Sequence, residues 1–269
     1  MGETVRVSRV ETDHGTIATV VLDRPEVRNA LLPSMVKHAR RAVDALSADP
    51  AVRCIVLRGA GEGKFAAFCA GADLRSAVLE DPQYLEKLET YLDDFHGWIR
   101  SIWNSPKPVL ARVDGGAVGF GCDLALACDL RIFSTHGYLQ SSFSRIGLIP
   151  DGGGTTTLAR LVGLGVASQM IYLAEKVAAD RAHALGLATH VVKPAELEAA
   201  TFAFAAQLAA APPLAFAEAK RALHASLAFS IDEVLGRERE AQLRCLRSSD
   251  AMEGLLAWTE KRPARFTGR

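Results

Sequence analysis

The chain has 269 residues, of which 49% are hydrophobic and 23% charged, enough to bury a large core in one domain with an appendage. Lysine plus arginine and aspartate plus glutamate both number 31, so the formal net charge is zero. This balance argues against a nucleic-acid footprint and against a basic patch for acidic membranes.

The cysteines and the N-terminal residues indicate a cytoplasmic protein. The cysteine number, five, is odd, and no pair has the C-x-x-C spacing of zinc or redox sites, so we expect reduced thiols. The N-terminus carries no apolar signal segment. The longest apolar run, 202–216, is interrupted by Gln207 and Pro212–Pro213 and cannot span a bilayer. The seven histidines are scattered without ligand spacing, so no metal site is expected.

Strands and helices alternate through the first half of the chain. Two β-rich runs, Val5–Val10 and Ile17–Leu22, flank Asp13-His14-Gly15 and predict a hairpin. Apolar residues at helical spacing predict a helix over Pro33–Leu46. The following elements are expected to be a strand at Cys54–Leu57, a small-residue loop at Gly61–Ala72, a long amphipathic helix at Tyr84–Trp103, and strands at Val109–Val113 and Leu130–Ser134.

The second half of the chain is mainly helical. We expect short helices at Thr155–Val162, Val166–Ala174 and Asp180–Leu185, and a last strand at His190–Val192. From Glu196 onward only helices are predicted, at Glu196–Ala211, Leu214–Ser226, Ile231–Ser248 and Ala251–Lys261. This order predicts a layered α/β core over residues 1–195 and a helical domain over residues 196–269.

The glycine-rich stretch Val113–Asp129 is the feature around which the chain is organised. Gly115, Gly116, Gly119 and Gly121 fall within seven positions, between an apolar strand and a buried helix. Such a turn points free N–H groups outward at a helix start, where the helix dipole favours negative charge. It is either a backbone donor for an oxyanion or a tight strand-to-helix turn.

Two further loops, Phe68–Leu74 and Ile149–Gly154, are also rich in small residues. With Asp114–Asp123 they could direct two backbone N–H groups at one atom, which is what an enolate or a tetrahedral oxyanion requires. The last of these loops adds a carboxylate, Asp151, next to a turn.

Taken as an ordered set, the motifs resemble those of the crotonase, or enoyl-CoA hydratase/isomerase, family. Each motif alone is weak, but the set spans nearly the whole chain in the family's order. The matching stretches are Leu22–Leu31 (LDRPEVRNAL), Phe68–Leu74 (FCAGADL), Lys107–Ala111 (KPVLA) with the glycine-rich turn, Leu124–Asp129 (LALACD), Gly147–Pro150 (GLIP), Leu161–Gly163 (LVG), Ala184–Ala188 (ALGLA) and Glu260–Arg262 (EKR).

The resemblance implies an α/β fold, a crotonase-like spiral of ββα units with a helical C-terminal trimerisation domain. It also implies an acyl-CoA thioester substrate, no cofactor other than the coenzyme A of that substrate, and a homotrimer or a dimer of trimers. The thioester oxygen would accept hydrogen bonds from the amides of Ala70 and Phe120. The family usually has glycine at the second position; here the phenyl ring either narrows the acyl pocket or faces the core.

The carboxylates are expected to decide the reaction. Hydratases of the family hold a water between two glutamates, whose positions correspond here to Asp123 and Phe143. Phe143 cannot ionise and is expected to be a pocket wall or plain core. Asp151 lies where isomerase branches of the family place an acidic base, although Asp in Pro-Asp-Gly is also a favourable turn residue. Asp123 either assists catalysis or stabilises a helix start.

For the coenzyme A part of the substrate, the resemblance indicates contacts near two loops and the C-terminus. The residues are Arg28, Ala30, Ala70, Gly71, Ala72, Asp73 and Leu74, with Lys261 and Phe266 reaching a neighbour's nucleotide, and Phe120 and Phe143 beside the acyl group. The C-terminal tail is otherwise a solvated basic end.

These observations predict an acyl-CoA isomerase in which Asp151 moves a proton while two amides hold an enolate. One alternative is an enoyl-CoA hydratase in which Asp123 and Asp151 together activate water. The other is a non-catalytic, acyl-CoA-binding member of the family.

Overall fold

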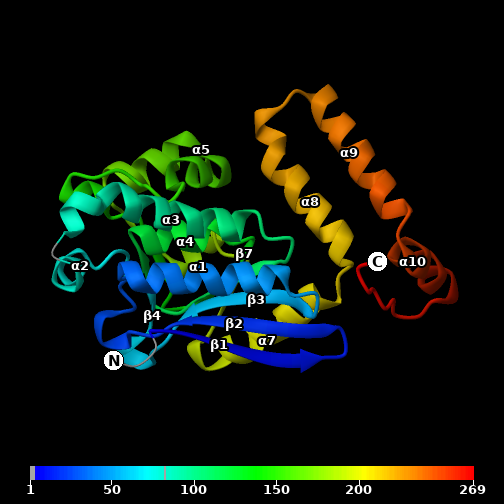
Figure 1. Ribbon diagram of the computed structural model, residues 1–269, viewed down its shortest axis with the longest axis horizontal. Coiled ribbons are helices and arrows are strands. Elements are labelled where there is room, and N and C mark those ends of the chain that lie inside the picture. The colour runs from blue at the N-terminus through cyan, green and yellow to red at the C-terminus, as the bar shows by residue number, and fades with distance from the viewer. Residues whose placement is uncertain (1–3, 82) are drawn as a thin grey trace.

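A six-stranded sheet forms the centre of the molecule (Figure 1). The computed structural model describes residues 4–81 and 83–269. The strand order is β1-β2-β3-β5-β7-β10. These strands are β1 (Val5–Thr12), β2 (Gly15–Leu22), β3 (Val52–Gly59), β5 (Val109–Val113), β7 (Leu130–Ser134) and β10 (His190–Val192). The predicted hairpin is confirmed, because β1 pairs with β2 antiparallel, and all the later pairs are parallel.

A second sheet contains four short strands in the order β4-β6-β8-β9. They are β4 (Ala67–Cys69), β6 (Gly116–Val118), β8 (Tyr138–Gln140) and β9 (Lys176–Ala178). Strands of three residues are too short to show an alternating pattern, so the sequence did not reveal them. Along the chain β3, β5 and β7 are each followed by a strand of this sheet and then by a helix, which is the predicted ββα succession.

Helices cover both sheets and make up most of the second half of the chain. They are α1 (Pro33–Ala48), α2 (Leu74–Glu80), α3 (Leu88–Trp103), α4 (Phe120–Ala127), α5 (Gly154–Tyr172), α6 (Ala179–Ala184), α7 (Leu197–Ala210), α8 (Pro213–Ala225), α9 (Ile231–Leu246) and α10 (Ser249–Glu260). The helix expected over Tyr84–Trp103 begins as a 3₁₀ turn and becomes α-helical at Leu88. The two helices expected on either side of Gly163 are confirmed, because α5 is kinked there, with non-helical backbone at Gly163 (φ 73°, ψ 163°).

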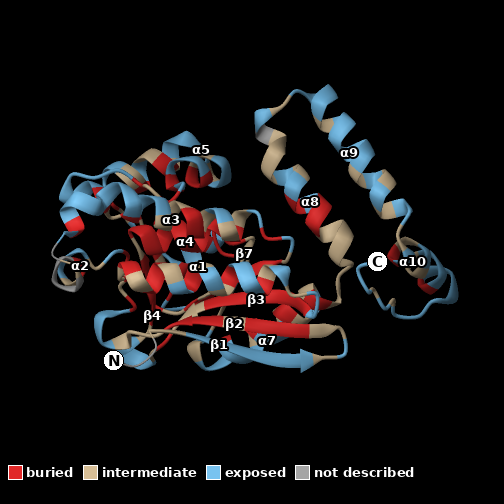
Figure 2. Cartoon of the chain, in the orientation of Figure 1, coloured by how far each residue is buried: buried red, intermediate tan, exposed pale blue. Residues whose placement is uncertain are grey.

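The hydrophobic core lies on both faces of the large sheet. On β3, Ile55 and Leu57 pack in the larger cluster with α1, α3 and α4, whereas Cys54 and Val56 pack in a second cluster with α7. Alternating side chains therefore point to two buried faces, which explains why this strand reads as a continuous apolar run. Figure 2 shows the buried residues concentrated in these central strands and in α4.

Beyond β10 the described chain contains helices and no strand. α7 packs on the sheet and belongs with the core by its contacts, although the sequence places it in the C-terminal domain. α8, α9 and α10 extend to one side of the sheets, and α9 has no buried residue among those described (Figures 1 and 2).

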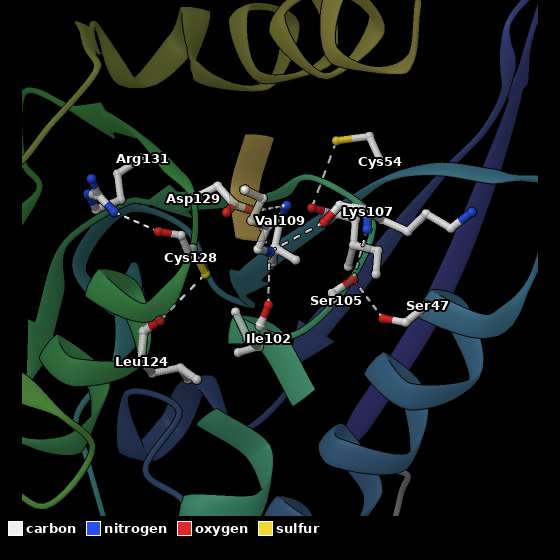
Figure 3. Close-up of polar contacts among 12 residues, drawn as sticks. Ser47, Cys54, Ile102, Ser105, Lys107, Val109, Leu124, Cys128, Asp129 and Arg131 are labelled. Carbon is white, nitrogen blue, oxygen red and sulfur yellow. Dashed lines mark hydrogen bonds and ion pairs between the residues drawn. The ribbon is translucent and has the colours of Figure 1, made fainter. Parts of the chain in front are cut away.

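One buried ion pair fastens α8 to the core. Lys220 Nζ lies 2.8 Å from Asp129 Oδ2 and donates to the carbonyl of Ile102 at 3.0 Å. The same Asp129 oxygen accepts from the Val109 N–H at 2.8 Å. Figure 3 shows three residues close together here: Val109 at the start of β5, Ile102 near the end of α3 and Asp129 just before β7.

No single helix in the described part of the chain is long and apolar enough to cross a bilayer. The segments Pro194–Ala210 and Pro213–Ala225 reach the required length and apolar composition only together, and a bend of 100° separates them. The first of them contains α7, which is packed on the central sheet.

Candidate active site

The three small-residue loops meet around one cavity of about 500 Å³. Its lining comes from the loop after β4, from the 3₁₀ turn before α3 and α3 itself, from the start of α4, and from the segment 142–151. The parallel order β4-β6-β8 brings the ends of these strands to one edge of the small sheet, and two of the loops directly follow β4 and β6. The predicted convergence of the loops is therefore confirmed.

The first loop offers the amide of Ala72, and not that of Ala70, to this cavity. The Ala70 N–H donates to the Arg28 carbonyl at 3.0 Å. Ala72 forms a parallel bridge with Leu31, in which the peptide groups on either side of Ala72 bond to Leu31 at 2.8 and 2.9 Å. Because successive peptide groups of an extended chain point to opposite sides, the Ala72 N–H points away from Leu31. The Ala72 N–H has no acceptor among the described residues. Because the Ala70 N–H is already bonded to Arg28, the prediction of Ala70 as the donor is wrong.

A second free amide belongs to Phe120, in the first turn of α4. N–H groups at a helix start have no acceptor within the helix, and this one has none elsewhere in the described chain. Gly119 precedes it with a φ of 56° and a ψ of −127°, a conformation that requires glycine. A Cβ on Gly71 would lie 3.3 Å from the Phe120 nitrogen, so the loop carrying Ala72 passes directly beside this amide.

Asp151 is the carboxylate that lines the cavity. It is half-buried, and its Oδ1 is buried with no hydrogen-bond partner among the described residues. Burial raises the pKa of Asp151, against the opposing effects of its own backbone N–H and of His96. A carboxylate with a raised pKa is a stronger base, which suits removal of a proton from carbon.

His96, on α3, is a site residue that the sequence analysis did not single out. It lines the cavity, and its charge acts on Asp151. Leu88 and Leu92 line the same cavity and precede His96 at intervals of four residues. Residues at this interval share one helix face, so the helical repeat was the signal that could have found His96.

Aromatic rings form much of the remaining wall. Phe120 meets Phe95 edge-on with ring centroids 4.6 Å apart, and Tyr84 stacks on Tyr91 at 4.9 Å. The Phe120 ring is buried and lines the cavity, so it both packs in the core and narrows the space for an acyl group. Phe143 is buried and also lines the cavity, as expected for a pocket wall.

Asp123 does not reach the cavity. Its side chain is 0% exposed, and its Oδ2 accepts from the Gly152 N–H at 2.9 Å. A Cβ on Gly152 or on Gly154 would collide with the Asp123 side chain, so the turn lies directly on the carboxylate. Burial, together with the charge of Asp151, raises the pKa of Asp123 to about 7. The predicted contact of Asp123 with reacting atoms does not hold, because the turn separates it from the cavity.

Comparison with known proteins identifies the family. A sequence model of the enoyl-CoA hydratase/isomerase family matches residues 12–269. The chain belongs to this family. It is 40% identical to a probable enoyl-CoA hydratase of Rhodobacter capsulatus over 97% of this chain and 98% of the relative. It is 32% identical to the mitochondrial methylglutaconyl-CoA hydratase of Mus musculus over 98% of this chain and 83% of the relative.

Solved structures of the family have the same fold. The enoyl-CoA hydratase of Bacillus anthracis superposes with a TM-score of 0.91 at 29% identity, covering 99% of this chain and 100% of that one. An enoyl-CoA hydratase of Polaromonas sp. JS666 gives a TM-score of 0.88 at 33% identity, covering 97% and 99%. The predicted crotonase fold is therefore confirmed.

The residues that the enoyl-CoA hydratase/isomerase resemblance assigns to coenzyme A surround the first loop. Arg28 is exposed and has a left-handed backbone with φ 55°. The next residue, Asn29, is buried and holds this turn by donating to the carbonyls of Ala60 and Ala67 at 2.9 and 2.8 Å. Ala30 is half-buried; its N–H donates to the Val27 carbonyl at 3.2 Å, and its carbonyl accepts from Arg24 at 2.7 Å.

Asp73 has a structural role that the sequence did not indicate. It caps α2 by accepting from the Ser76 N–H at 3.0 Å, and it pairs with Arg24 at 3.0 Å. Leu74, which follows it, is exposed and lines the cavity together with Gly71 and Ala72.

Lys261 and Phe266 are not brought to the cavity of their own chain. Lys261 is the exposed C-cap of α10, and the Phe266 carbonyl accepts from Arg53 at 3.2 Å. Figure 1 places α10 and the C-terminus on the opposite side of the molecule from α2. Within one chain these two residues are therefore separated from the acyl site.

Proposed function

We propose that this member of the enoyl-CoA hydratase/isomerase family is an acyl-CoA isomerase, which moves a double bond or rearranges a ring through an enolate. The observation that carries the proposal is the single carboxylate, Asp151, among the described residues that line the cavity. An isomerase needs one base that removes a proton and returns it elsewhere.

In the proposed mechanism the thioester oxygen accepts hydrogen bonds from the Ala72 and Phe120 amides. Asp151 takes a proton from the α or γ carbon, and the electron pair of that C–H bond moves into an enolate whose charge rests on the thioester oxygen. The protonated Asp151 then returns the proton to the other carbon. The two amides act most strongly on the enolate, and removing one such donor typically costs about a hundredfold to a thousandfold in rate.

An acyl-CoA thioester is the proposed substrate, and the reaction as written needs no cofactor beyond its coenzyme A. Arg28, Ala30 and the segment 71–74 would contact the pantetheine and nucleotide. The aromatic lining would hold the acyl group. Five cysteines without a disulfide suit the cytoplasm, which we propose as the compartment.

A hydratase is the second candidate, because the relatives described above are named as hydratases. It would have to activate water with Asp151 and without Asp123, since Asp123 is sealed behind the Gly152–Gly154 turn. A non-catalytic acyl-CoA-binding role is the third candidate, because Phe143 occupies the position of the second family glutamate.

The three candidates separate on two substrates. We expect 3-enoyl-CoA to be converted to the conjugated 2-enoyl thioester, seen as a rise in ultraviolet absorbance. A fall in absorbance with 2-enoyl-CoA, without conversion of 3-enoyl-CoA, would favour the hydratase. Tight binding of CoA esters without turnover of either substrate would favour the binding role.

The proposed base is tested by Asp151→Asn, which keeps the shape of the side chain and removes its basicity. Isomerisation should fall by about 10²–10⁴-fold, the usual contribution of a general base. CoA-ester binding, measured by calorimetry, should stay within a few fold. An unchanged rate would remove Asp151 from the mechanism.

A further inference from the structure

The carboxylate of Asp123 lies against the N-terminus of a different helix, α5. α5 begins at Gly154, its N-cap residue is Gly153, and no side chain of its own caps it. Asp123 Oδ2 instead accepts from the Gly152 N–H at 2.9 Å. The backbone of Gly154 also favours the charged form of Asp123 and lowers its pKa, although Asp123 Oδ1 has no hydrogen-bond partner among the described residues. Asp123 therefore holds the residue immediately before the N-cap, and its carboxylate lies at a helix start, where negative charge is favourable.

The fit between this carboxylate and the turn is close. A Cβ on Gly154 would lie 2.1 Å from Asp123 Oδ1, and one on Gly152 would lie 2.6 Å from the Asp123 Cβ. Because Gly152 and Gly154 have no Cβ, their backbone can pack directly against the Asp123 side chain. One additional methylene at position 123 would push the carboxylate into the turn.

We propose that Asp123 is a positioning residue, which caps the turn before α5 through its hydrogen bond to Gly152 and thereby fixes the turn that carries the base Asp151. Asp151 immediately precedes the capped Gly152, so a shift of the turn moves the base relative to the substrate. Asp123 touches neither the cavity nor the reacting atoms. This inference rests on the proposed function for its kinetic consequences, but the cap itself can be observed without any turnover.

Three substitutions of Asp123 test the proposal, because each one removes a different part of its contact with the turn. Asp123→Asn keeps one acceptor for Gly152 and loses the charge, so we expect kcat to fall by no more than about tenfold. Asp123→Ala loses both acceptors, and we expect kcat to fall by about a hundredfold, the effect of a displacement near 1 Å. Asp123→Glu keeps the carboxylate but does not fit, and should resemble the alanine variant. KM should change less than kcat in all three, because the CoA contacts are elsewhere.

The second readout is hydrogen–deuterium exchange of the peptide covering residues 150–158, which does not depend on activity. Exchange should be fastest in the alanine variant, intermediate in Asp123→Asn and slowest in wild type. Asp180→Ala, an exposed first-turn residue of α6, is the matched control and should change neither kcat nor this exchange.

Two results would overturn the proposal. One is Asp123→Asn as inactive as Asp151→Asn with unchanged exchange, which would make Asp123 an acid–base group. The other is unchanged exchange in Asp123→Ala, or in Asp123→Asn if the alanine variant does not fold. If wild type turns over no acyl-CoA, the proposed function fails while the exchange result still decides the cap.

Discussion

At the scale of single residues, the raising of the Asp151 pKa by burial is opposed by its own backbone N–H and then by the charge of His96. Burial alone raises the pKa of the Asp151 carboxyl, which would leave more of it protonated and unable to act as a base. A nearby imidazolium favours the ionised form and lowers that pKa. His96 therefore extends to lower pH the range over which Asp151 is ionised and can act as the proposed base.

We predict that His96→Gln moves the acidic limb of the kcat/KM–pH profile to higher pH. Without the imidazolium the pKa of Asp151 rises further, so the ionised base is lost at a higher pH as the solution is acidified. The rate on the alkaline plateau should stay within about tenfold, because His96 is not proposed to transfer a proton. His38→Gln, an exposed histidine on α1, should leave the profile unchanged. A plateau that falls a hundredfold without any shift would contradict this role.

Two of the expected site residues depend on the resemblance to the family. Asp151 and Phe143 were expected at the acyl site because their positions match those of the family's motifs, and both line the cavity. The donor amide was predicted two residues too early, at Ala70 instead of Ala72. Which peptide groups of an extended segment face a pocket depends on its bridge to Leu31, a pairing between distant segments that no local pattern encodes.

At the scale of elements, length and burial decided which strands could be predicted. Val109–Val113, Leu130–Ser134 and His190–Val192 are strands with the predicted bounds, because apolar and β-branched residues mark them. The three-residue strands of the small sheet were missed, since their stability comes from pairing with neighbours rather than from their own sequence. α2 was also missed, although Asp73 supplies a helix cap.

The ion pair between Lys220 and Asp129 is the element-scale contact whose loss should be most costly. Lys220→Met leaves Asp129 buried beside Val109 without its counter-ion, which typically costs about 3–5 kcal/mol. We predict a loss of this size in the free energy of unfolding, measured by urea denaturation at fixed protein concentration. α8 should also become more accessible to protease, because this pair joins α8 to the core.

Two comparisons make that prediction specific. Adding Asp129→Asn to Lys220→Met removes the stranded charge and should restore part of the lost stability, since the amide oxygen can still accept from Val109. Arg9→Met breaks an exposed pair with Asp49 and should cost at most about 1 kcal/mol. Equal losses from Arg9→Met and Lys220→Met would show that burial of the pair is irrelevant.

At the scale of the whole molecule, α9 and α10 carry several exposed apolar side chains. Trp258 is 80% exposed, and Leu246, Met252 and Leu255 are each more than half exposed. Large exposed apolar patches on soluble domains generally mark contacts with other chains. A near-zero net charge adds no long-range repulsion against association. This surface indicates association through these helices, and the resemblance to the family implies the number of chains, so we propose a homotrimer or a dimer of trimers.

We predict that wild type elutes with the mass of three or six chains in size-exclusion chromatography with light scattering. Placing a carboxylate in the patch, by Trp258→Glu together with Leu255→Glu, should shift the mass to one chain at micromolar concentration, because an unpaired charge cannot be buried in an apolar contact. Val7→Glu, an exposed apolar position on β1, is the control and should keep the wild-type mass. A wild type that is monomeric at the same concentration would contradict the assembly.

The assembly also bears on the C-terminal residues that lie far from their own cavity. If Lys261 and Phe266 contact the nucleotide bound to a neighbour, the double glutamate variant should lose CoA-ester affinity although every residue lining its own cavity is intact. Lys261→Ala should lose affinity while retaining the oligomeric mass, since Lys261 is exposed at the end of α10. Binding that is unaffected in both variants would leave the tail as a solvated basic end and place the whole CoA site within one chain.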